Sequence, residues 1–130
     1  MPKAEDCRYT KEHEWVHPES DQTVWVGITD FAQQELGDIV YVDMPEAGQS
    51  FGAGDEMGTI ESVKAVAEVY APIAGEILEV NESLADSPEK VNSDPMADGW
   101  LIKMKPADSS ELDKLMSHED YQKFLEEADH

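Results

Sequence analysis

The stretch that decides the fold is MGTIESVKAVAEVYAPIAGEILEV, residues 57–80. Its β-branched and apolar residues are interrupted twice, first at Val63 and Lys64 and then at the bend from Ala71 to Gly75. This pattern predicts three short strands joined by a turn and a bend. Neither Val63 nor Lys64 is the Asn or Gly that a tight primed turn favours, so a longer or type I connection stays open. We therefore expect a hairpin that carries Lys64 at its tip.

Further short elements are predicted on both sides of this hairpin. A helix is expected to begin at Asp30, with Gln33 as its capping-box partner and Gly37 as its stop. Beyond residue 109, apolar residues recur at helical spacing and predict two short C-terminal helices at about 109–128. Additional strands are expected at residues 23–28, 39–44 and 101–105.

These elements predict a mostly β fold of the α+β class. So many short strands close most naturally into a compact barrel or sandwich with helices at its periphery. The chain has 130 residues, the length of one ordinary domain. We expect that domain to span residues 1–130, with its core at about 9–106.

Composition and charge exclude several classes of function. The chain has 9 Lys and Arg against 30 Asp and Glu, a net charge of −21, which repels nucleic acids and anionic membranes. Hydrophobic residues make up 40%, enough for a folded core, yet no apolar run approaches the roughly 20 residues that span a bilayer. Cys7 is the only cysteine, which excludes an intrachain disulfide, and the first residues have no signal or transit character. A cytoplasmic monomer is expected.

Lys64 stands alone among acidic residues. It is the only Lys or Arg between Lys11 and Lys90. The simpler interpretation is a solvated turn lysine beside Glu61 or Glu68, in a pair that contributes little stability. The sharper interpretation is an acylation site, because an exposed amine on a flexible stem at the tip of a stiff hairpin can carry a covalent prosthetic arm. Acylation would also remove the one positive charge of this stretch.

The residues around Lys64 favour the acylation site through a family resemblance. The segment Glu61-Ser62-Val63-Lys64-Ala65 resembles the lipoyl-attachment hairpin of the glycine cleavage system H-protein family. Nearly the whole chain, from about Tyr9 to the last helix, is similar to that family. The other motifs that carry the resemblance are YAP (70–72), GEI (75–77), KEHEW (11–15), VGIT (26–29), LGD (36–38), YVDMP (41–45), VNSDP (91–95) and GW (99–100).

The resemblance implies a fold and a function. The fold is the lipoyl/biotinyl-domain type, a flattened β-barrel or sandwich (a barrel-sandwich hybrid) of two small antiparallel sheets with short peripheral helices. Lys64 would carry lipoate in amide linkage, placed there by lipoate-attaching enzymes. The chain would be a carrier without catalytic residues. It would take the aminomethyl group of glycine from the P-protein (the decarboxylating glycine dehydrogenase) to the T-protein (the aminomethyltransferase) and then be reoxidised by the L-protein.

The resemblance also assigns Glu14 and Glu68 to the groove in which the loaded arm rests. We expect the two carboxylates to hold the arm's amine by charge-assisted contacts. Glu12 and Glu68 depart from the residues common at these positions in the family, Ser and Asp, so the groove can differ from that of relatives while the attachment site stays the same.

Three alternatives stay open at the level of sequence. Biotin carriers of the same hairpin type place methionines beside the lysine, whereas this chain has Val63 and Ala65. An H-like lipoyl relay, which serves lipoate transfer or another pathway, would share Lys64 and its hairpin. An unmodified binding module would leave Lys64 bare under all conditions.

The segment His13-Glu14-Trp15-Val16-His17 matches the H-E-x-x-H pattern of zinc proteases. That chemistry requires a helix, because only helical spacing brings both imidazoles to one zinc ion. Pro18 disfavours the helical region for His17, and Trp15 and Val16 favour a strand. In a strand the two histidines would lie roughly 13 Å apart. We therefore predict no metal site.

Overall fold

The computed structural model describes residues 4–19 and 21–128. Its helices are η1 (Ala4–Asp6), α1 (Asp30–Leu36), α2 (Ser83–Asp86), α3 (Lys90–Ser93), η2 (Ser109–Lys114) and α4 (His118–Ala128), where η marks 3₁₀ geometry. Its strands are β1 (Arg8–Tyr9), β2 (Glu14–Pro18), β3 (Val24–Ile28), β4 (Ile39–Asp43), β5 (Ser50–Phe51), β6 (Glu56–Ser62), β7 (Val66–Tyr70), β8 (Gly75–Val80) and β9 (Ile102–Pro106).

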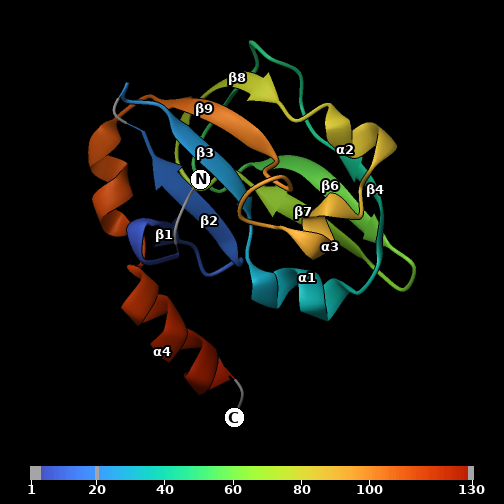
Figure 1. Ribbon diagram of the computed structural model, residues 1–130. Coiled ribbons are helices and arrows are strands. Elements are labelled where there is room, and N and C mark those ends of the chain that lie inside the picture. Colours follow the sequence, from blue (N-terminus) through green and yellow to red (C-terminus); the bar gives the residue numbers. More distant parts are fainter. Residues whose placement is uncertain (1–3, 20, 129–130) are drawn as a thin grey trace.

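The strands form two antiparallel sheets (Figure 1). The large sheet has the order β1-β2-β3-β9-β8-β5, and the small sheet has the order β4-β6-β7. Neither sheet closes on itself, so the sandwich form of the predicted barrel or sandwich is the one present. The mostly β sandwich with short peripheral helices expected from the sequence is thereby confirmed.

The main core lies between the two sheets because each strand sends alternate side chains inward. From the large sheet, Val26 and Ile77 are completely buried, and from the small sheet Ile60 and Val69 are nearly so. Burying each of these side chains contributes about 1.5–3 kcal/mol. The hairpin of β6 and β7 is therefore anchored by its inner face, while its far end lies at the periphery, on the right of Figure 1.

A second apolar cluster fixes the C-terminal helix. Tyr121 of α4 is buried and its ring stacks on Tyr9 of β1 at a centroid distance of 4.7 Å. Trp15 is fully buried in the same cluster, and its indole donates a hydrogen bond to the carbonyl of Pro95 at 3.0 Å. A Cβ at Gly27 would lie 2.7 Å from that indole, so only glycine fits beside Trp15.

One local prediction at α1 is wrong. The helix begins at Asp30 and ends before Gly37 as expected, but its N-cap is Thr29, whose hydroxyl accepts from the Ala32 N–H. Gln33 forms no capping box, because its side-chain oxygen accepts from Asn92 and not from a backbone N–H, while its side-chain nitrogen donates to the Asp30 carboxylate. Asp30 thus lies in the first turn, where a carboxylate stabilises the helix dipole.

The other predicted elements agree with the structure to within a residue or two. The two C-terminal helices are present, and the first of them, η2, has 3₁₀ geometry. The sequence analysis did not predict β1, β5, α2 or α3, which have two to four residues each. Elements this short lack the repeats from which a period can be recognised.

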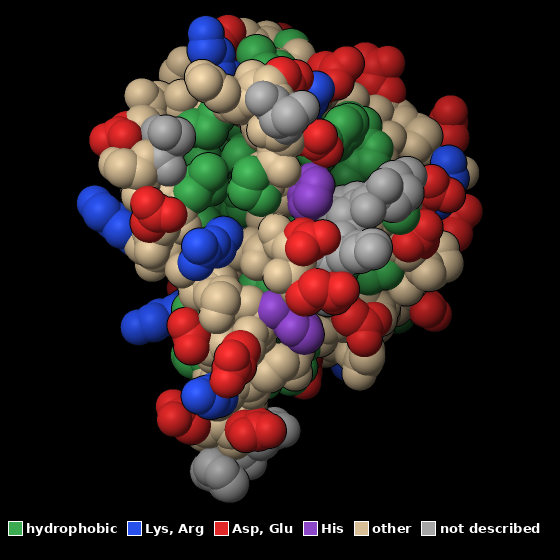
Figure 2. All heavy atoms as spheres, turned by 60° about the vertical axis from the view of Figure 1, so that its left-hand side comes forward, with side chains coloured by type: hydrophobic (Ala, Val, Ile, Leu, Met, Phe, Trp, Pro, Cys, Tyr) green, Lys and Arg blue, Asp and Glu red, His purple; other side chains and the backbone are tan. Residues whose placement is uncertain are grey.

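Charge is spread unevenly over the surface. Acidic side chains far outnumber Lys and Arg on the face in Figure 2 and continue along the projecting C-terminal end.

No helix of the described residues is long and apolar enough to cross a membrane.

Candidate functional site

The tip of the β6–β7 hairpin is a three-residue loop, 63–65, with Lys64 at its centre. The Ser62 N–H donates to the Ala65 carbonyl at 2.8 Å, which closes the loop. The Ser62 hydroxyl oxygen accepts from the N–H of Lys64 at 3.3 Å and from the N–H of Ala65 at 3.0 Å. Ser62 therefore satisfies two of the loop's three backbone donors, which explains how a turn without Asn or Gly holds its shape.

The loop is also tied to the end of α1. The N–H of Val63 donates to the Asp38 carbonyl at 3.1 Å. Just before Asp38, Gly37 has φ +82° and ψ −155°, a region that is open essentially to glycine alone. The stem of Lys64 lies over Gly37, where a Cβ would be 3.3 Å from Lys64 Cε. Gly37 thus supplies both the turn and the space that the lysine stem occupies.

The Asn92 side chain of α3 is hydrogen-bonded to the segment that joins α1 to β4. Its side-chain oxygen accepts from the Ile39 N–H at 2.8 Å, and its amide donates to the Gly37 carbonyl at 2.8 Å and to Gln33 Oε1 at 2.9 Å. One amide therefore fixes the end of α1 and the start of β4. The hairpin tip rests on a support that is itself hydrogen-bonded.

The Lys64 side chain is exposed to solvent. Among the residues described, no carboxylate oxygen lies within 4.0 Å of its Nζ, so the pair with Glu61 or Glu68 in the simpler interpretation is not formed. Both glutamates are exposed as well. An amine in this position is accessible and makes no ion pair that a modification would break.

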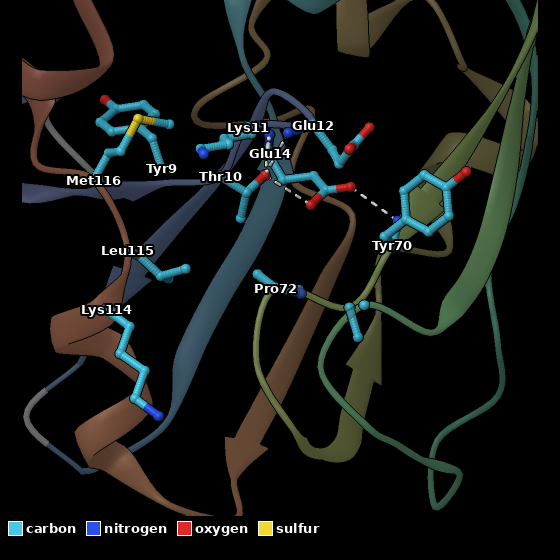
Figure 3. Close-up of a pocket in the computed structure, with 12 residues that line it drawn as sticks. Tyr9, Thr10, Lys11, Glu12, Glu14, Tyr70, Pro72, Lys114, Leu115 and Met116 are labelled. Carbon is cyan, nitrogen blue, oxygen red and sulfur yellow. Dashed lines mark hydrogen bonds between the residues drawn. The ribbon is translucent and has the colours of Figure 1, made fainter. Parts of the chain in front are cut away.

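Glu14, the first residue of β2, is buried, with 2% of its surface exposed. Its Oε2 accepts from the Tyr70 backbone N–H at 2.8 Å, and its Oε1 accepts from the Thr10 hydroxyl at 3.0 Å (Figure 3). Burial raises the pKa of Glu14 to about 7, although both hydrogen bonds oppose that shift. Near neutral pH this carboxyl group is therefore poised between its neutral and its charged form.

Two hollows adjoin Glu14. One is a cleft of about 180 Å³ along β7, the edge strand of the small sheet, and both Glu14 and Glu68 line it. Its apolar walls include Phe31 and Leu36 of α1. Leu36 directly precedes Gly37, over which the Lys64 stem lies. The structure therefore brings Glu14 and Glu68 together in one cleft, whereas Lys64 is not among the residues that line it.

The second hollow, of about 430 Å³, is also lined by Glu14 (Figure 3). It is lined by Tyr70 at the end of β7, by Pro72 just after that strand, and by Leu115 and Met116 after η2. The sequence analysis did not predict this hollow, because its walls come from segments that are distant in the chain.

The chain is similar to known proteins over nearly its whole length. A family model described as "Glycine cleavage H-protein" matches residues 7–128. The glycine cleavage system H protein of Halothermothrix orenii is 51% identical over 129 residues, which cover 99% of this chain and 100% of that protein. That of Escherichia coli is 52% identical over 122 residues, covering 94% of this chain and 95% of that protein.

The chain belongs to the glycine cleavage H-protein family. A crystal structure of a glycine cleavage system H protein from Mycobacterium marinum has the same fold, with a TM-score of 0.82 and 37% sequence identity. The match covers 93% of this chain and 95% of that one. The family resemblance given by the sequence motifs is thereby confirmed.

In this H-protein family member the H-E-x-x-H segment is a strand. Residues 14–18 form β2, as Trp15 and Val16 predicted. His13 precedes the strand with φ +68°, and its Nδ1 lies 2.8 Å from the Tyr121 hydroxyl. His17 instead lies beside Cys7. Within the described ranges, no group of three or more His, Cys, Asp or Glu is placed to hold a metal ion.

Two residues that organise the site of this H-protein were missed at the level of sequence. Tyr121 of α4 has its hydroxyl 2.8 Å from both His13 Nδ1 and Thr29 Oγ1, so the last helix stabilises the segment that leads to Glu14. Asn92 has the anchoring role described above. In the sequence, Tyr121 contributed only to the helical spacing of apolar residues, and Asn92 was noted only as part of the VNSDP motif. Neither pattern indicated a hydrogen-bond partner.

Proposed function

We propose that Lys64 carries a lipoyl group in amide linkage and that the chain is the lipoyl-bearing shuttle of glycine cleavage. The observation that carries the proposal is the placement of Lys64, exposed at the tip of a hairpin that Ser62 and Asp38 brace. Membership of the H-protein family supports it, because the relatives are named as components of the glycine cleavage system.

The residues around Lys64 fit such a group. Amide formation converts a positively charged ammonium into a neutral amide, and no ion pair is lost because none is formed among the described residues. Ala65 has a small side chain, and Ser62 is committed to the loop's backbone. The Val63 side chain is uncharged, and Glu61 forms no ion pair with Lys64. The loop thus presents the amine without competing for it.

The cleft beside β7 fits the working end of the arm. When bound, a lipoyl group supplies a dithiolane that accepts an aminomethyl group and is reduced in doing so. Glu14 and Glu68 offer carboxylates to an amine that enters the cleft, and Phe31 and Leu36 give it apolar walls. A nearby ammonium lowers the pKa of Glu14 from about 7, so that the carboxyl group becomes charged when its partner arrives. Glu14 would thereby bind the cation and shelter it.

The chain itself supplies presentation and protection, and it acts as a carrier without catalytic residues. The P-protein, T-protein and L-protein would act in turn on the arm, and lipoate-attaching enzymes would load it. A tether of this kind raises the effective concentration of the carried group at each partner. A monomeric, cytoplasmic carrier stays a prediction from the sequence.

The test is the intact mass of the chain purified from its own host, followed by peptide mapping across residues 63–70. We expect the mass increment of one lipoyl group, located on Lys64. The K64R variant should keep its fold and lack the increment, while K90R, a matched change on α3, should retain it. The loaded chain should then support glycine decarboxylation by the P-protein, which distinguishes the shuttle from a relay that only hands on lipoate.

An unmodified Lys64 would refute the proposal if the same cells carry lipoate on other proteins. Loaded protein that does not support glycine decarboxylation would refute the shuttle role alone.

A further inference from the structure

The large hydrophobic side chains that the described structure exposes are gathered beside Lys64. The exposed fractions are 50% for Val40, 52% for Tyr41, 71% for Val63 and 63% for Val66. All four belong to the small sheet or to its hairpin loop. Single exposed apolar residues are common on protein surfaces, but a cluster of them at one end of a very acidic molecule indicates contact with a partner. We name these four residues the tip patch.

The strand register explains why the patch is continuous. Tyr41 of β4 pairs with Glu61 of β6, and Glu61 pairs with Val66 of β7. Directly paired residues of an antiparallel sheet point to the same face, so these three side chains form one row across the sheet. The next residues, Val42 and Ile60, face the core. The row therefore lies on the outer face, at the end of the sheet that carries the loop.

The loop and a bulge complete the patch. Val63 directly precedes Lys64 in the loop. Val40 lies where the register between β4 and β6 shifts, next to Tyr41. Exposed apolar side chains thus lie at the end of the small sheet that carries Lys64.

Acidic side chains surround the tip patch. Glu61 lies within the row, Asp43 lies in the next row along β4, and Asp38 adjoins the loop, and all three are exposed. Lys64 is the only Lys or Arg between Lys11 and Lys90, and its charge disappears on acylation. A partner that covers this surface needs an apolar centre and a basic rim.

We propose that the tip patch is the docking surface for the enzyme that acylates Lys64, and that this enzyme meets it with an apolar surface ringed by Lys and Arg. The inference rests on the proposed function. The acylating enzyme must bring Nζ itself to bonding distance of an acyl carbon, and therefore must cover the loop and the strands beside it. Enzymes that act on the far end of the arm do not need to bring Nζ into their active sites.

The chemistry of attachment likewise requires direct contact between Nζ of Lys64 and the acyl carbon held by the enzyme. The Lys64 ammonium loses one proton to become a nucleophile, and its nitrogen forms a bond to the carbonyl carbon of an activated acyl donor, either an acyl adenylate or a thioester. The bond from that carbon to the leaving group breaks, the leaving group departs with the electron pair, and the nitrogen loses a second proton to give the amide. No oxidant or reductant is needed.

The experiment uses the unmodified full-length chain, a purified lipoate ligase, lipoate and ATP. The triple variant Y41T/V63T/V66T replaces apolar surface by side chains that retain strand propensity. We expect kcat/KM for acylation of Lys64 to fall about tenfold, mainly through KM, because a few apolar anchors dominate such contacts. E61Q should lower kcat/KM by about twofold to threefold and weaken its dependence on salt, whereas E76Q, an equally exposed change on β8, should do neither.

Two controls separate docking from other effects. Acylation of Lys64 by a small amine-reactive ester should proceed at the wild-type rate in the triple variant, because that reagent needs no docking surface. Triple variant that has been driven to full lipoylation should support glycine decarboxylation within about twofold of wild type.

The outcomes distinguish the two proposals. If wild-type Lys64 is not acylated by the ligase, the proposed function fails. If wild type is acylated and the triple variant reacts at the same rate within about twofold, the docking inference alone is wrong. An equal fall in the reaction with the small ester, or a defect confined to glycine decarboxylation, would likewise overturn it, because the patch would then serve the lysine itself or another partner.

Discussion

The backbone N–H of Tyr70 donates a hydrogen bond to Glu14 Oε2 at 2.8 Å, although the two residues lie 56 positions apart in the chain. Glu14 begins β2 in the large sheet, and Tyr70 ends β7 in the small sheet. The contact therefore joins the two sheets at one point. Glu14 also lines both hollows described above, the cleft of about 180 Å³ and the one of about 430 Å³. A single buried carboxyl group thus has a structural role and faces the cleft proposed for the arm.

We expect the E14A variant to be about 2–4 kcal/mol less stable than wild type, because it leaves the buried Tyr70 N–H without an acceptor and opens a cavity. E14Q retains an acceptor oxygen of the same reach and should lie within about 1 kcal/mol of wild type. Urea unfolding at pH 7 measures both changes. Equal losses for Ala and Gln would show that the negative charge, and not the hydrogen bond, is what matters at this position.

The raised pKa of Glu14 predicts a pH dependence of stability. The folded-state pKa of about 7 lies above the unfolded value of 4.5, so the folded state holds a proton that the unfolded state releases between these values. The contribution is fully present below pH 4.5 and is lost as the pH rises through 7. Each pH unit in that window lowers the free energy of unfolding by about 1.4 kcal/mol.

The measurement is the free energy of unfolding of wild type minus that of E14Q, from pH 5 to pH 8. The subtraction removes contributions common to both proteins, including that of His13, whose pKa burial lowers. The difference should fall with rising pH and level off above pH 7. A difference that stays constant would contradict the raised pKa.

The sequence predicted the regular parts of this fold because strong local signals and tertiary packing agree there. The β-branched runs became β3, β4, β6 and β7, and Gly37 ended α1. The cap of α1 was misassigned to Asp30 because Thr29 and Asp30 are both good capping residues, and the choice depends on how the chain enters the helix. The division of the strands into two separate sheets has no local signature in the sequence.

The site was predicted unevenly for the same reason. Lys64 was singled out by its isolation among acids and by the motif around it, and its assignment as the attachment site stays a prediction. Glu14 was assigned to the groove only through the family resemblance, and its bond to the Tyr70 N–H has no local signature, because nothing near either residue specifies a partner 56 positions away. The tip patch depends on the register of three strands, which no single strand encodes.

Gly37 should tolerate no side chain. Its φ of +82° and ψ of −155° lie in a region that costs a non-glycine residue about 1–3 kcal/mol. We expect G37A and G37N to lose stability by similar amounts, because asparagine tolerates the left-handed helical region but not this one. Thermal unfolding gives the comparison, with G52A as the control at an exposed glycine without a positive φ. A stable G37N would show that the segment relaxes to a left-handed conformation.

The last prediction concerns the support of the hairpin tip. N92A removes the acceptor of the Ile39 N–H and the donor to the Gly37 carbonyl, and should lower the free energy of unfolding by about 2–3 kcal/mol. N92D keeps the acceptor and loses the donor, so its loss should be intermediate. S93A, at the exposed neighbouring position, should stay within about 0.5 kcal/mol of wild type.

Hydrogen exchange locates the consequence of losing this support. The Val63 N–H donates to the carbonyl of Asp38, which lies between the two residues that Asn92 holds. Its protection should therefore fall further in N92A than that of the Ile60 N–H in the middle of β6. If protection falls equally at both amides, Asn92 contributes only to global stability, and the tip of the hairpin does not depend on it.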